Sequence, residues 1–452
     1  VHAHCPTGKR PCVRVRKPHE MVGTTVIGVI ADDVTGGTDV AVAFRRAGLA
    51  TVILFGSPDS ETILPYHDAV VIALKTRTLP VDDAVAESLR AAEWLKNHGA
   101  SQLYFKYCST FDSKPEGNIG QVADALADLQ GSRLTVVAPA SPEHRRTQYM
   151  GNLFVAEQPL AESPMSHHPL TPMTDSNVVR LLSAQTERPV ELVSQKTVRA
   201  GARAIREYLD EMAGRGVRYA VTDAITATDL QAIGDACRDD VLVTGAAGLA
   251  GGLGRSLAGN RGSSHDHEQD PVGTGRAVAL AGSCSARTRE QVSYMREREP
   301  SFFLDAVSSP DPVQLAESAL AWFGTLPHDA RPLIYSTLEP GELRRTQEIL
   351  GTERSSAILE KATGLIARGL VERGVRRIVT AGGETSGAVV QALGVQGGTI
   401  GTEMAPGVPW IYTTGEIPIA LLLKSGNFGD PRMLAQAVHA DANAGEASLA
   451  GH

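Results

Sequence analysis

The chain has 452 residues, which is too long for one ordinary hydrophobic core and indicates two domains. With 42% hydrophobic and 21% charged residues, its composition is that of a soluble globular protein. The formal net charge is −8 and the Lys and Arg residues are scattered, which argues against a nucleic acid partner. No apolar run approaches the roughly 20 residues needed to cross a bilayer, so no membrane partner is expected. The five cysteines are widely separated, which fits a reducing cytoplasm better than a disulfide framework.

Composition also divides the chain. The basic first residues lack the apolar segment of a secretory signal, so we expect a disordered extension over 1–21 before a start at Met21. A polar, Gly-rich stretch without periodicity is expected to be a linker and an Ala- and Gly-rich end a flexible tail. The expected units are an N-terminal domain at 22–258, the linker at 259–275, a C-terminal domain at 276–440 and the tail at 441–452.

Short β-branched runs alternate with amphipathic helical segments throughout. Continuous apolar runs are typical of strands that helices cover on both faces. The alternation predicts an α/β fold in which each domain is a mostly parallel sheet flanked by helices. We expect strands at 25–30, 51–55, 69–74, 102–107, 134–138, 219–223 and 241–245, then at 277–282, 301–306, 332–336 and 377–383, with helices at 81–98, 202–213, 313–323, 355–373 and 384–393.

Two adjacent aspartates, Asp32 and Asp33, follow the first strand and precede a helix expected from Gly37 to Gly48. Adjacent ionised carboxylates cost free energy unless solvent, a cation or a reaction uses them. Ligands of open α/β sheets bind at the carboxyl ends of the strands, so one carboxylate would face a cleft while the other braces the turn. In the alternative, one aspartate only caps the helix and the other is solvated.

Charged and hydroxyl side chains follow the next strands. Lys75 and Arg77 come directly after the third strand, where they suit recognition of a carboxylate, although a solvated loop is an equal alternative. The stretch after the fourth strand suits a polyhydroxylated, anionic substrate, and Cys108 within it is expected to be a small buried side chain rather than a nucleophile. The candidate residues of that stretch are Lys106, Ser109, Thr110 and Asp112.

A histidine pair, His167 and His168, lies before a helix whose first turn is expected at 174–176. Adjacent histidines cannot easily converge on one ion, and no carboxylate is spaced to join them. We therefore prefer a loop that covers the substrate, with a metal site as the alternative.

Three Gly- and Ser-rich turns, at 282–291, 380–394 and 421–430, follow apolar runs in the second half. Small residues let backbone N–H groups approach an anion, and a helix N-terminus favours negative charge, so a nucleotide site is expected. The Walker loop and the protein-kinase motifs are absent. The run at 245–254 is similar to part of a dinucleotide fingerprint, but the expected acidic residue would fall in the linker, which weakens an NAD site.

Together these motifs resemble the four-carbon acid sugar kinase family, in order and over nearly the whole chain from residue 25 to 430. The resemblance implies a sugar acid on the N-terminal domain, ATP on the C-terminal domain and an active site in the cleft between them. The third and fourth motifs are similar to the 3-oxo-tetronate kinase branch. The motifs are ADDVTGGTD (31–39), KTRT (75–78), YFKYCSTFDSKPEGNIG (104–120), HPLTPMTDSN (168–177), AGSCS (281–285), AGGETSGAVV (381–390), PGVPW (406–410) and LKSGNFG (423–429).

The activity implied by the resemblance is phosphorylation of the 4-hydroxyl of a 3-oxo-tetronate, with ATP and Mg²⁺, in carbohydrate acid catabolism. Such an enzyme is a phosphotransferase with an alcohol group as acceptor. One alternative is a D-threonate or D-erythronate 4-kinase, and a second is a sugar-acid-binding regulatory protein without catalysis. An NAD-dependent dehydrogenase is a third. The implied partners are the sugar acid and ATP, and a homodimer is left open.

The resemblance also implies roles for individual residues. One of Asp32 and Asp33 would deprotonate the attacking hydroxyl, and the other would bind Mg²⁺ through water or brace the loop. The chain departs from the family at 143–145, where small residues are usual, at Asn152, often His, and at Ala405, often acidic, which leaves fine substrate specificity open. Substrate binding is assigned to Lys75, Arg77, Lys106, Ser109, Thr110, Asp112 and Arg146, and ATP binding to Ser283, Ser285, Gly382, Gly383, Glu384, Thr385, Ser386, Lys424 and Gly426, with no metal ligand fixed.

Overall fold

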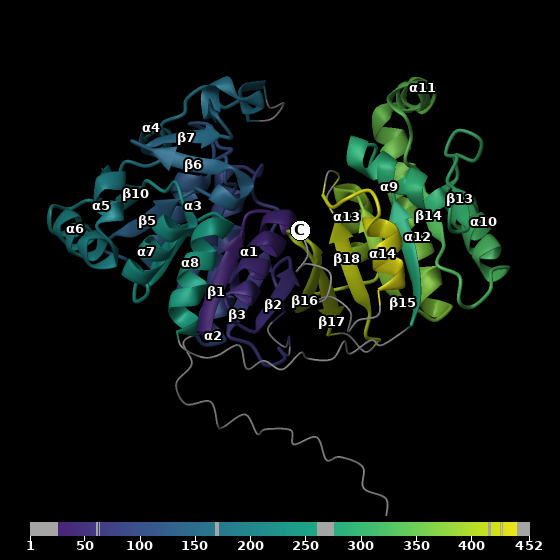
Figure 1. The fold of residues 1–452 in the computed structure, drawn as a ribbon, viewed down its shortest axis with the longest axis horizontal. Helices are drawn as coiled ribbons and strands as arrows, with labels where there is room; N and C mark the ends of the chain where they lie inside the picture. Colours follow the sequence, from purple (N-terminus) through teal and green to yellow (C-terminus); the bar gives the residue numbers. More distant parts are fainter. Residues whose placement is uncertain are drawn as a thin grey trace, which may run out of the picture.

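The computed structural model consists of two lobes that lie side by side (Figure 1). The expected N-terminal extension, nearly all of the expected linker, the tail and His168 lie outside the residues that the structure describes. The described residues are 26–59, 62, 64–167, 171–259, 275–414, 417–424, 426 and 428–440.

Among the described residues, the N-terminal lobe contains eight parallel strands, of which seven were expected from the alternating pattern and one, at Val190–Val193, was not. The strand β1, which precedes the aspartate pair, lies between β3 and β4, so the segments that follow these three strands share one edge. In spatial order the strands are β2 (Thr51–Phe55), β3 (Ala69–Ala73), β1 (Val26–Ala31), β4 (Ala100–Lys106), β11 (Leu242–Gly245), β5 (Thr135–Ala138), β10 (Tyr219–Thr222) and β9 (Val190–Val193).

In the part of the C-terminal lobe that the structure describes there are five parallel strands and an antiparallel hairpin. The expected strand at 301–306 is shorter in the structure and ends at Phe303. The parallel strands are β13 (Ser301–Phe303), β14 (Leu333–Tyr335), β12 (Arg276–Ala281), β15 (Val375–Ala381) and β18 (Ala420–Lys424), and the hairpin is β17 (Val408–Thr413) with β16 (Gly397–Ala405).

The two lobes share one sheet, which the sequence did not predict. Within the described residues fifteen strands are joined, because β16 pairs antiparallel with β2. The pairing is close: a Cβ atom at Gly397 would lie 2.2 Å from the carbonyl oxygen of Ile53, and one at Gly398 would lie 2.3 Å from that of Tyr412. These glycines lower the β-propensity of the segment, so the sequence pattern did not indicate a strand. They are also what allows the strand to pair on both sides.

The twist of this sheet determines which edges face each other. Because β16 is antiparallel to β2, the carboxyl ends of β1 and β15 would lie at opposite edges of a flat sheet. A twist of roughly 20–25° per strand accumulates to roughly 120–150° over the steps from β1 through β3, β2, β16, β17 and β18 to β15. This rotation accounts for the two carboxyl ends facing one cleft.

Helices cover both faces of the sheet. In β1, Ile27 and Val29 pack with α1 and α8 in one core cluster, while Ile30 packs with α2 and α3 in another. None of the helices in the described part of the chain has both the length and the apolar character needed to cross a bilayer. One face of the N-terminal lobe is covered by α1 (Val34–Arg46), α8 (Ala247–Ala258), α7 (Ala227–Ala236) and α6 (Ala202–Gly214), and the other by α2 (Val81–Asn97) and α3 (Ile119–Gln130). One face of the C-terminal lobe is covered by α10 (Pro312–Gly324), α12 (Thr352–Glu372) and α13 (Gly383–Ala392), and the other by α9 (Ala286–Arg296) and α14 (Met433–His439). The remaining named helix, α11 (Pro340–Leu350), packs on α12.

A small three-stranded antiparallel sheet lies above the N-terminal lobe in Figure 1. Its first turn is held by Asp223, which accepts hydrogen bonds from the backbone N–H groups of Met150 (2.8 Å) and Gly151 (2.9 Å). The helix expected to begin at 174–176 begins instead at Val178, because Asn177 is its cap. These elements are β6 (Arg146–Tyr149), β7 (Asn152–Val155), β8 (Gln158–Pro159), α4 (Val178–Ser183) and α5 (Gln195–Arg199), with short 3-10 turns at Pro142–His144, Leu160–Glu162 and Pro164–His167.

The glycine run at 245–254 packs helices together. A Cβ atom at Gly252 would lie 2.2 Å from the carbonyl oxygen of Leu230 on α7, and one at Gly248 would lie 2.8 Å from that of Ala140. Close contact between α7 and α8 therefore explains the glycines without a dinucleotide.

The substitution Gly252→Ala is expected to destabilise the fold by roughly 1–3 kcal/mol, because the added methyl group meets backbone atoms that cannot move aside. The neighbouring Gly251→Ala is the matched control, since its Cβ would have only the end of the Arg255 side chain within 4 Å, at 3.5 Å. That change is expected to be neutral or stabilising by up to about 1 kcal/mol. Urea unfolding of both variants measures the difference, and equal midpoints would contradict the packing role.

Candidate active site

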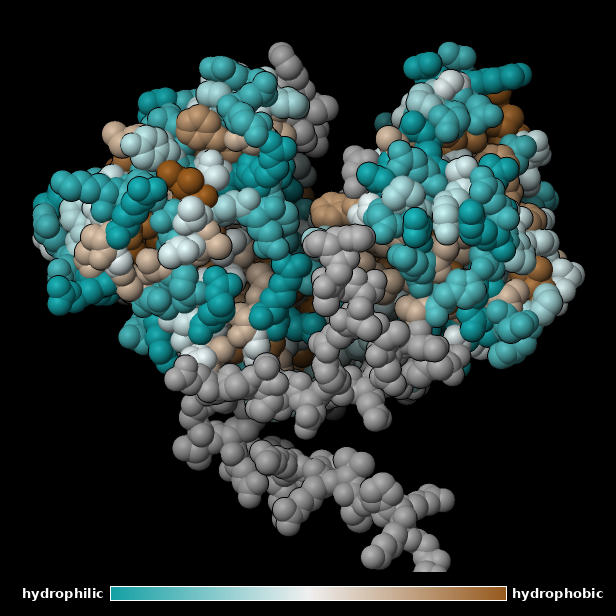
Figure 2. Space-filling model, viewed as in Figure 1, coloured by the Kyte–Doolittle hydropathy of each residue, from teal (hydrophilic) through white to brown (hydrophobic). Residues whose placement is uncertain are grey.

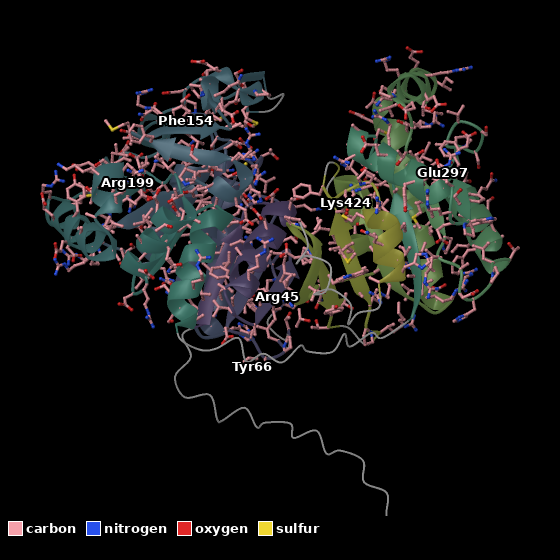
Figure 3. All side chains as sticks on the ribbon, in the orientation of Figure 1. Arg45, Tyr66, Phe154, Arg199, Glu297 and Lys424 are labelled. Atoms are coloured by element: carbon pink, nitrogen blue, oxygen red, sulfur yellow. The ribbon has the colours of Figure 1, made fainter. Side chains whose placement is uncertain are left out.

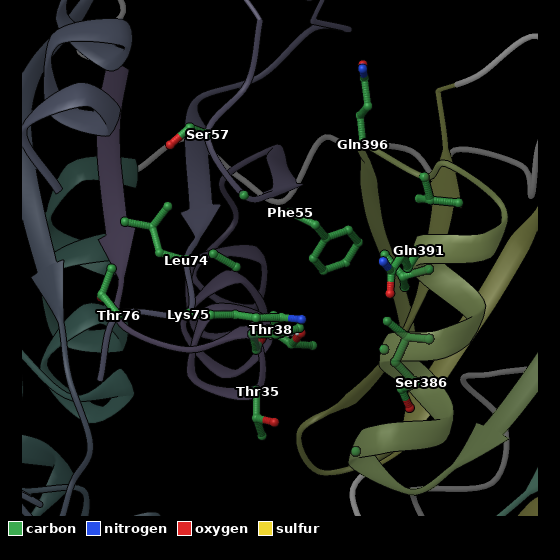
Figure 4. A pocket seen from close by; sticks show the side chains of 18 of the residues that line it. Thr35, Thr38, Phe55, Ser57, Leu74, Lys75, Thr76, Ser386, Gln391 and Gln396 are labelled. Atoms are coloured by element: carbon green, nitrogen blue, oxygen red, sulfur yellow. Dashed lines mark hydrogen bonds between the residues drawn. The ribbon is translucent and has the colours of Figure 1, made fainter. Parts of the chain in front are cut away.

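A cleft of about 860 Å³ lies between the two lobes, and residues of both line it. Figure 2 shows the molecule hollowed between the lobes. In Figure 4, Lys75 extends from the end of β3 toward α13, which carries Ser386 and Gln391, and Phe55 lies between the lobes. The lining residues used below are Thr35, Thr38, Phe55 and Lys75 from the N-terminal lobe and Gly383, Ser386, Gln391, Gly407, Lys424 and Phe428 from the C-terminal lobe.

One guanidinium group bridges the aspartate pair. Arg77 donates to both carboxylate oxygens of Asp32, from Nε to Oδ2 at 2.8 Å and from Nη2 to Oδ1 at 2.9 Å. The same Nη2 lies 2.8 Å from Oδ1 of Asp33. The cation therefore explains how two adjacent carboxylates are tolerated here. It also means that Arg77, expected to bind the substrate, is already held by protein carboxylates.

The two aspartates have different environments. The side chain of Asp32 is 4% exposed and that of Asp33 is 28% exposed. Asp33 caps α1 by accepting a 2.8 Å hydrogen bond from the Gly36 N–H at Oδ1. The helix thus begins at Val34 instead of the expected Gly37, and Gly48 follows its end with a φ of 93°. The capping alternative was correct for Asp33, whereas Asp32 is buried rather than solvated.

Burial acts in opposite directions on the pKa values of Asp32 and Arg77. Burial raises the pKa of Asp32, although the hydrogen bonds and charge of Arg77 act to lower it. Burial acts to lower the pKa of Arg77, but its bonds to Asp32 raise it overall. The pair is therefore a fixed internal ion pair, and Asp33 is the more accessible carboxylate.

A second cation lies beneath the first turn of α1. Lys106, the last residue of β4, is 3% exposed and donates from Nζ to the Tyr107 carbonyl oxygen at 2.8 Å. A Cβ atom at Gly36 would lie 2.8 Å from this Nζ, so the helix start has no room for a side chain there. Burial raises the pKa of Asp39, on the same helix, and the charge of Lys106 opposes that effect.

The loop after Lys106 contains the expected hydroxyl and carboxylate groups. Thr110 and Asp112 are buried, at 3% and 9% exposure, and Ser109 is partly buried. Among the described atoms, Oδ1 of Asp112 is buried without a hydrogen-bond partner. Burial and the charge of Asp112 raise the pKa of Cys108 to about 11, which fits the expectation that this thiol is not a nucleophile.

The two remaining substrate candidates lie apart from this loop. Lys75 is exposed and lines the cleft. Arg146 begins β6, and its buried Nε has no partner among the described atoms. The structure therefore places Lys75 at the cleft facing the C-terminal lobe, whereas Arg146 is not among the residues that line the cleft.

The three Gly- and Ser-rich turns of the C-terminal lobe meet at the carboxyl ends of β12, β15 and β18. A Cβ atom at Gly282 would lie 2.4 Å from Oγ1 of Thr385, and one at Gly426 would lie 3.0 Å from the hydroxyl oxygens of Ser283 and Ser285. Such close approach requires glycine. The turns thus form one continuous surface of backbone groups and small side chains.

The middle turn opens α13. Gly382 precedes the helix with a φ of 132°, and Gly383 is its first residue and is exposed to the cleft. Ser386 donates to the Gly382 carbonyl oxygen at 2.7 Å, so its hydroxyl group stabilises the turn. Glu384 is exposed in the first helical turn. The unpaired N–H groups of such a helix start favour an anion.

Lys424 ends β18 in the C-terminal lobe (Figure 3), and its side chain bonds to the first and third of these turns. It is fully buried, and Nζ donates to the Gly426 carbonyl oxygen at 2.7 Å and to Oγ1 of Thr288 at 3.0 Å. Burial, with the charge of Arg287, lowers the pKa of Lys424 to about 8.

Several groups of the cleft were not predicted from the sequence. Thr38 lies one helical turn after Thr35 on α1, and the motif at 31–39 contains it, so the helical spacing could have identified it. Gln391 lies in the stretch 380–394 and Gly407 in the motif 406–410, but neither was assigned a role. Phe55 carries no such signal, because the pairing of β2 with β16 brings it to the cleft.

Metal ligands are not clustered in the described part of the chain, where no group of three or more His, Cys, Asp or Glu side chains is placed to hold an ion. Mg²⁺ that accompanies a nucleotide usually takes only one or two protein carboxylates beside phosphate oxygens and water. Asp33 and Glu384 fit that smaller requirement, since both are at least partly exposed.

Comparison with known families defines the class of protein. Residues 27–253 match the family described as a sugar-binding N-terminal domain, and residues 278–434 match the family described as a nucleotide-binding C-terminal domain. The chain is thus a two-domain protein with one domain of each kind.

The relatives define the branch. A 3-oxo-tetronate kinase of Pseudomonas fluorescens is 47% identical over 408 residues, which cover 89% of this chain and 94% of the relative. One of Brucella melitensis is 43% identical over 89% and 93% of the two chains. The chain belongs to the four-carbon acid sugar kinase family, in its 3-oxo-tetronate kinase branch, as the motifs predicted.

Solved structures share the fold. A crystal structure from Salmonella typhimurium LT2 superposes with a TM-score of 0.85 at 42% identity and covers 91% of this chain and 98% of its own. The Haemophilus influenzae protein HI1011 gives a TM-score of 0.82 at 41% identity, with the same coverage.

Proposed function

We propose that this protein transfers the γ-phosphoryl group of ATP to the 4-hydroxyl of a 3-oxo four-carbon sugar acid. The observation that carries the proposal is the cleft in which the helix capped by Asp33 and the side chain of Lys75 face the start of α13. Phosphoryl transfer needs positioning and charge neutralisation, and these groups supply both. The family and the names of the relatives support the same reaction.

Asp33 is proposed as the general base and Asp32 as the residue that positions it. Both described bonds to Asp33 end on Oδ1, from Gly36 and Arg77, so Oδ2 can accept the proton of the attacking hydroxyl. Asp32 has both oxygens engaged by Arg77, which holds it in place. The different hydrogen bonds of Asp32 and Asp33 thus separate two residues that the sequence left equivalent.

The sugar acid is proposed to lie against the N-terminal lobe. Oδ1 of Asp112, buried and without a described partner, would accept a hydrogen bond from a substrate hydroxyl, and Nε of Arg146 would donate to the carboxylate. Ser109 and Thr110 would supply hydroxyl groups, and Lys106 and Arg77 a positive field beneath them. Lys75 points across the cleft, so we assign it to the transferred phosphoryl group.

The triphosphate is proposed to lie on the three turns of the C-terminal lobe. Backbone N–H groups of the Gly382–Ser386 helix start would bind phosphate oxygens, beside Ser283, Ser285 and Gly426, and Lys424 would add positive charge. Mg²⁺, held by Glu384, would neutralise part of the phosphate charge when bound.

The substrate class is tested by ADP release with Mg-ATP and a panel of four-carbon sugar acids and their 3-keto derivatives. We expect turnover with a 3-keto acid and little with D-threonate or D-erythronate. Preference for the latter two would favour the alternative kinase. Binding of a sugar acid without ADP release would favour a regulatory protein.

The variant Asp33→Asn is expected to lower kcat by roughly 10²- to 10⁴-fold, because it removes the general base. Asn is also a good helix cap, so the start of α1 and the affinity for ATP should be preserved. Steady-state kinetics and calorimetric ATP titration measure the two effects. The control is Asp128→Asn, at an aspartate paired with Arg188 outside the cleft; a kcat for Asp33→Asn within fivefold of this control would contradict the role.

ATP affinity is expected to fall as pH rises through about 8. The lowered pKa means that Lys424 loses its proton near that pH, and a neutral amine no longer attracts phosphate. The dissociation constant should rise by up to about tenfold per pH unit above 8. Titrations between pH 7 and 9.5 should show this slope in the unmodified protein and not in Lys424→Arg, whose charge does not titrate there. The same slope in the unmodified protein and in Lys424→Arg would contradict the role of the Lys424 charge in ATP binding.

A further inference from the structure

An ion pair joins the two domains at the far end of α1. Arg46, the last residue of the helix, donates to both oxygens of Glu403 on β16, from Nε at 2.6 Å and from Nη2 at 3.0 Å. Glu403 belongs to the C-terminal matched domain, and α1 to the N-terminal one. Nη1 of Arg46 also meets Glu143, whose side chain is 60% exposed, whereas that of Glu403 is 14% exposed.

Glu403 extends this link to the nucleotide side of the cleft. Its Oε1 accepts a 2.8 Å hydrogen bond from the Gly407 N–H, in the turn between β16 and β17. Gly407 lines the cleft, and a Cβ atom there would lie 3.3 Å from the ring of Phe428, two residues beyond Gly426. These contacts therefore connect Arg46 to the third of the three proposed phosphate-binding turns, at 421–430.

The helix α1 carries the link to the other side of the cleft. Its 13 residues span roughly 18 Å, and an α-helix of this length moves as a rigid element. Asp33 and Arg77 hold its first turn, while Arg46 and Glu403 hold its last. With both ends held, the tilt of the helix relative to the β16–β17 hairpin is fixed.

We propose that Arg46 and Glu403 are positioning residues that align the proposed base, Asp33, with the triphosphate held by the other domain. The proposal rests on the proposed function. An ordinary exposed salt bridge contributes little, but this one is bidentate, is partly buried at Glu403 and includes a backbone hydrogen bond. The neighbouring charges are Glu143, Asp39, Lys106 and His144, and the last lies 4.0 Å from Asp39.

The test compares Arg46→Met and Glu403→Gln, and the variant combining them, with Glu143→Gln as the matched control. Gln at 403 can still accept the Gly407 hydrogen bond through its Oε1, so that change removes the charge and the acceptor of the Arg46 Nε bond. Each single variant is expected to lower kcat by about tenfold with both KM values within about threefold, since misalignment affects the chemical step. The combined variant should lose no more than the worse single one.

The control Glu143→Gln removes only the exposed partner of Arg46, so the kcat of this variant should stay within about twofold of that of the unmodified protein. Arg46→Lys, which keeps the charge but not the bidentate geometry, should recover part of the loss. Single variants with unchanged kcat, or losses that multiply in the combined variant, would overturn the proposal. A loss in Glu143→Gln as large as in Arg46→Met would also overturn it.

Hydrogen–deuterium exchange supplies a readout that does not depend on turnover. Arg46→Met should speed exchange of the amides at 397–413, Gly407 among them, and Glu143→Gln should not. Unchanged exchange in Arg46→Met would overturn the link itself. No ADP release by the unmodified protein with any acid of the panel would instead overturn the proposed function, so the two failures are distinguishable.

Discussion

The pairing of β16 with β2 is the interaction on which the rest of the structure depends. It turns two α/β domains into one twisted sheet, and the twist brings strand ends from opposite edges to a common cleft. The backbone hydrogen bond from the Phe55 N–H to the Gln396 carbonyl oxygen, at 2.8 Å, lies at the base of this junction. The geometry of the site is therefore a property of the sheet more than of any single loop.

Electrostatic balance explains the composition of the N-terminal side of the cleft. Three carboxylates, of Asp32, Asp33 and Asp39, lie near two cations, Arg77 and Lys106. Buried charges are retained only when they are paired. Arg77 and Lys106, which the sequence predicted to bind the substrate, therefore also neutralise the buried carboxylates. Lys75, which is exposed in the cleft, is the cation of this group best placed to meet an incoming phosphate.

Much of this fold could be predicted, because strands covered on both faces give continuous apolar runs. β2 was predicted to the residue, and β1, β5 and β15 to within a few residues. The hairpin at 397–413 was missed, since the glycines of β16 and the proline within β17 weaken the strand pattern and the pairing with β2 is long-range. The same limit applies to the site: adjacency along the chain identified Asp32 and Asp33, but contacts such as Arg46 with Glu403 join residues far apart in sequence.

A shared sheet also makes each half dependent on the other. If the chain were divided between its two matched domains, the strand TVILF of β2 would become an unprotected sheet edge, and β16 would lose the partner on its other side. Exposed apolar edges of this kind recruit further strands and lead to aggregation. The two domains thus match different families, but each covers a sheet edge of the other.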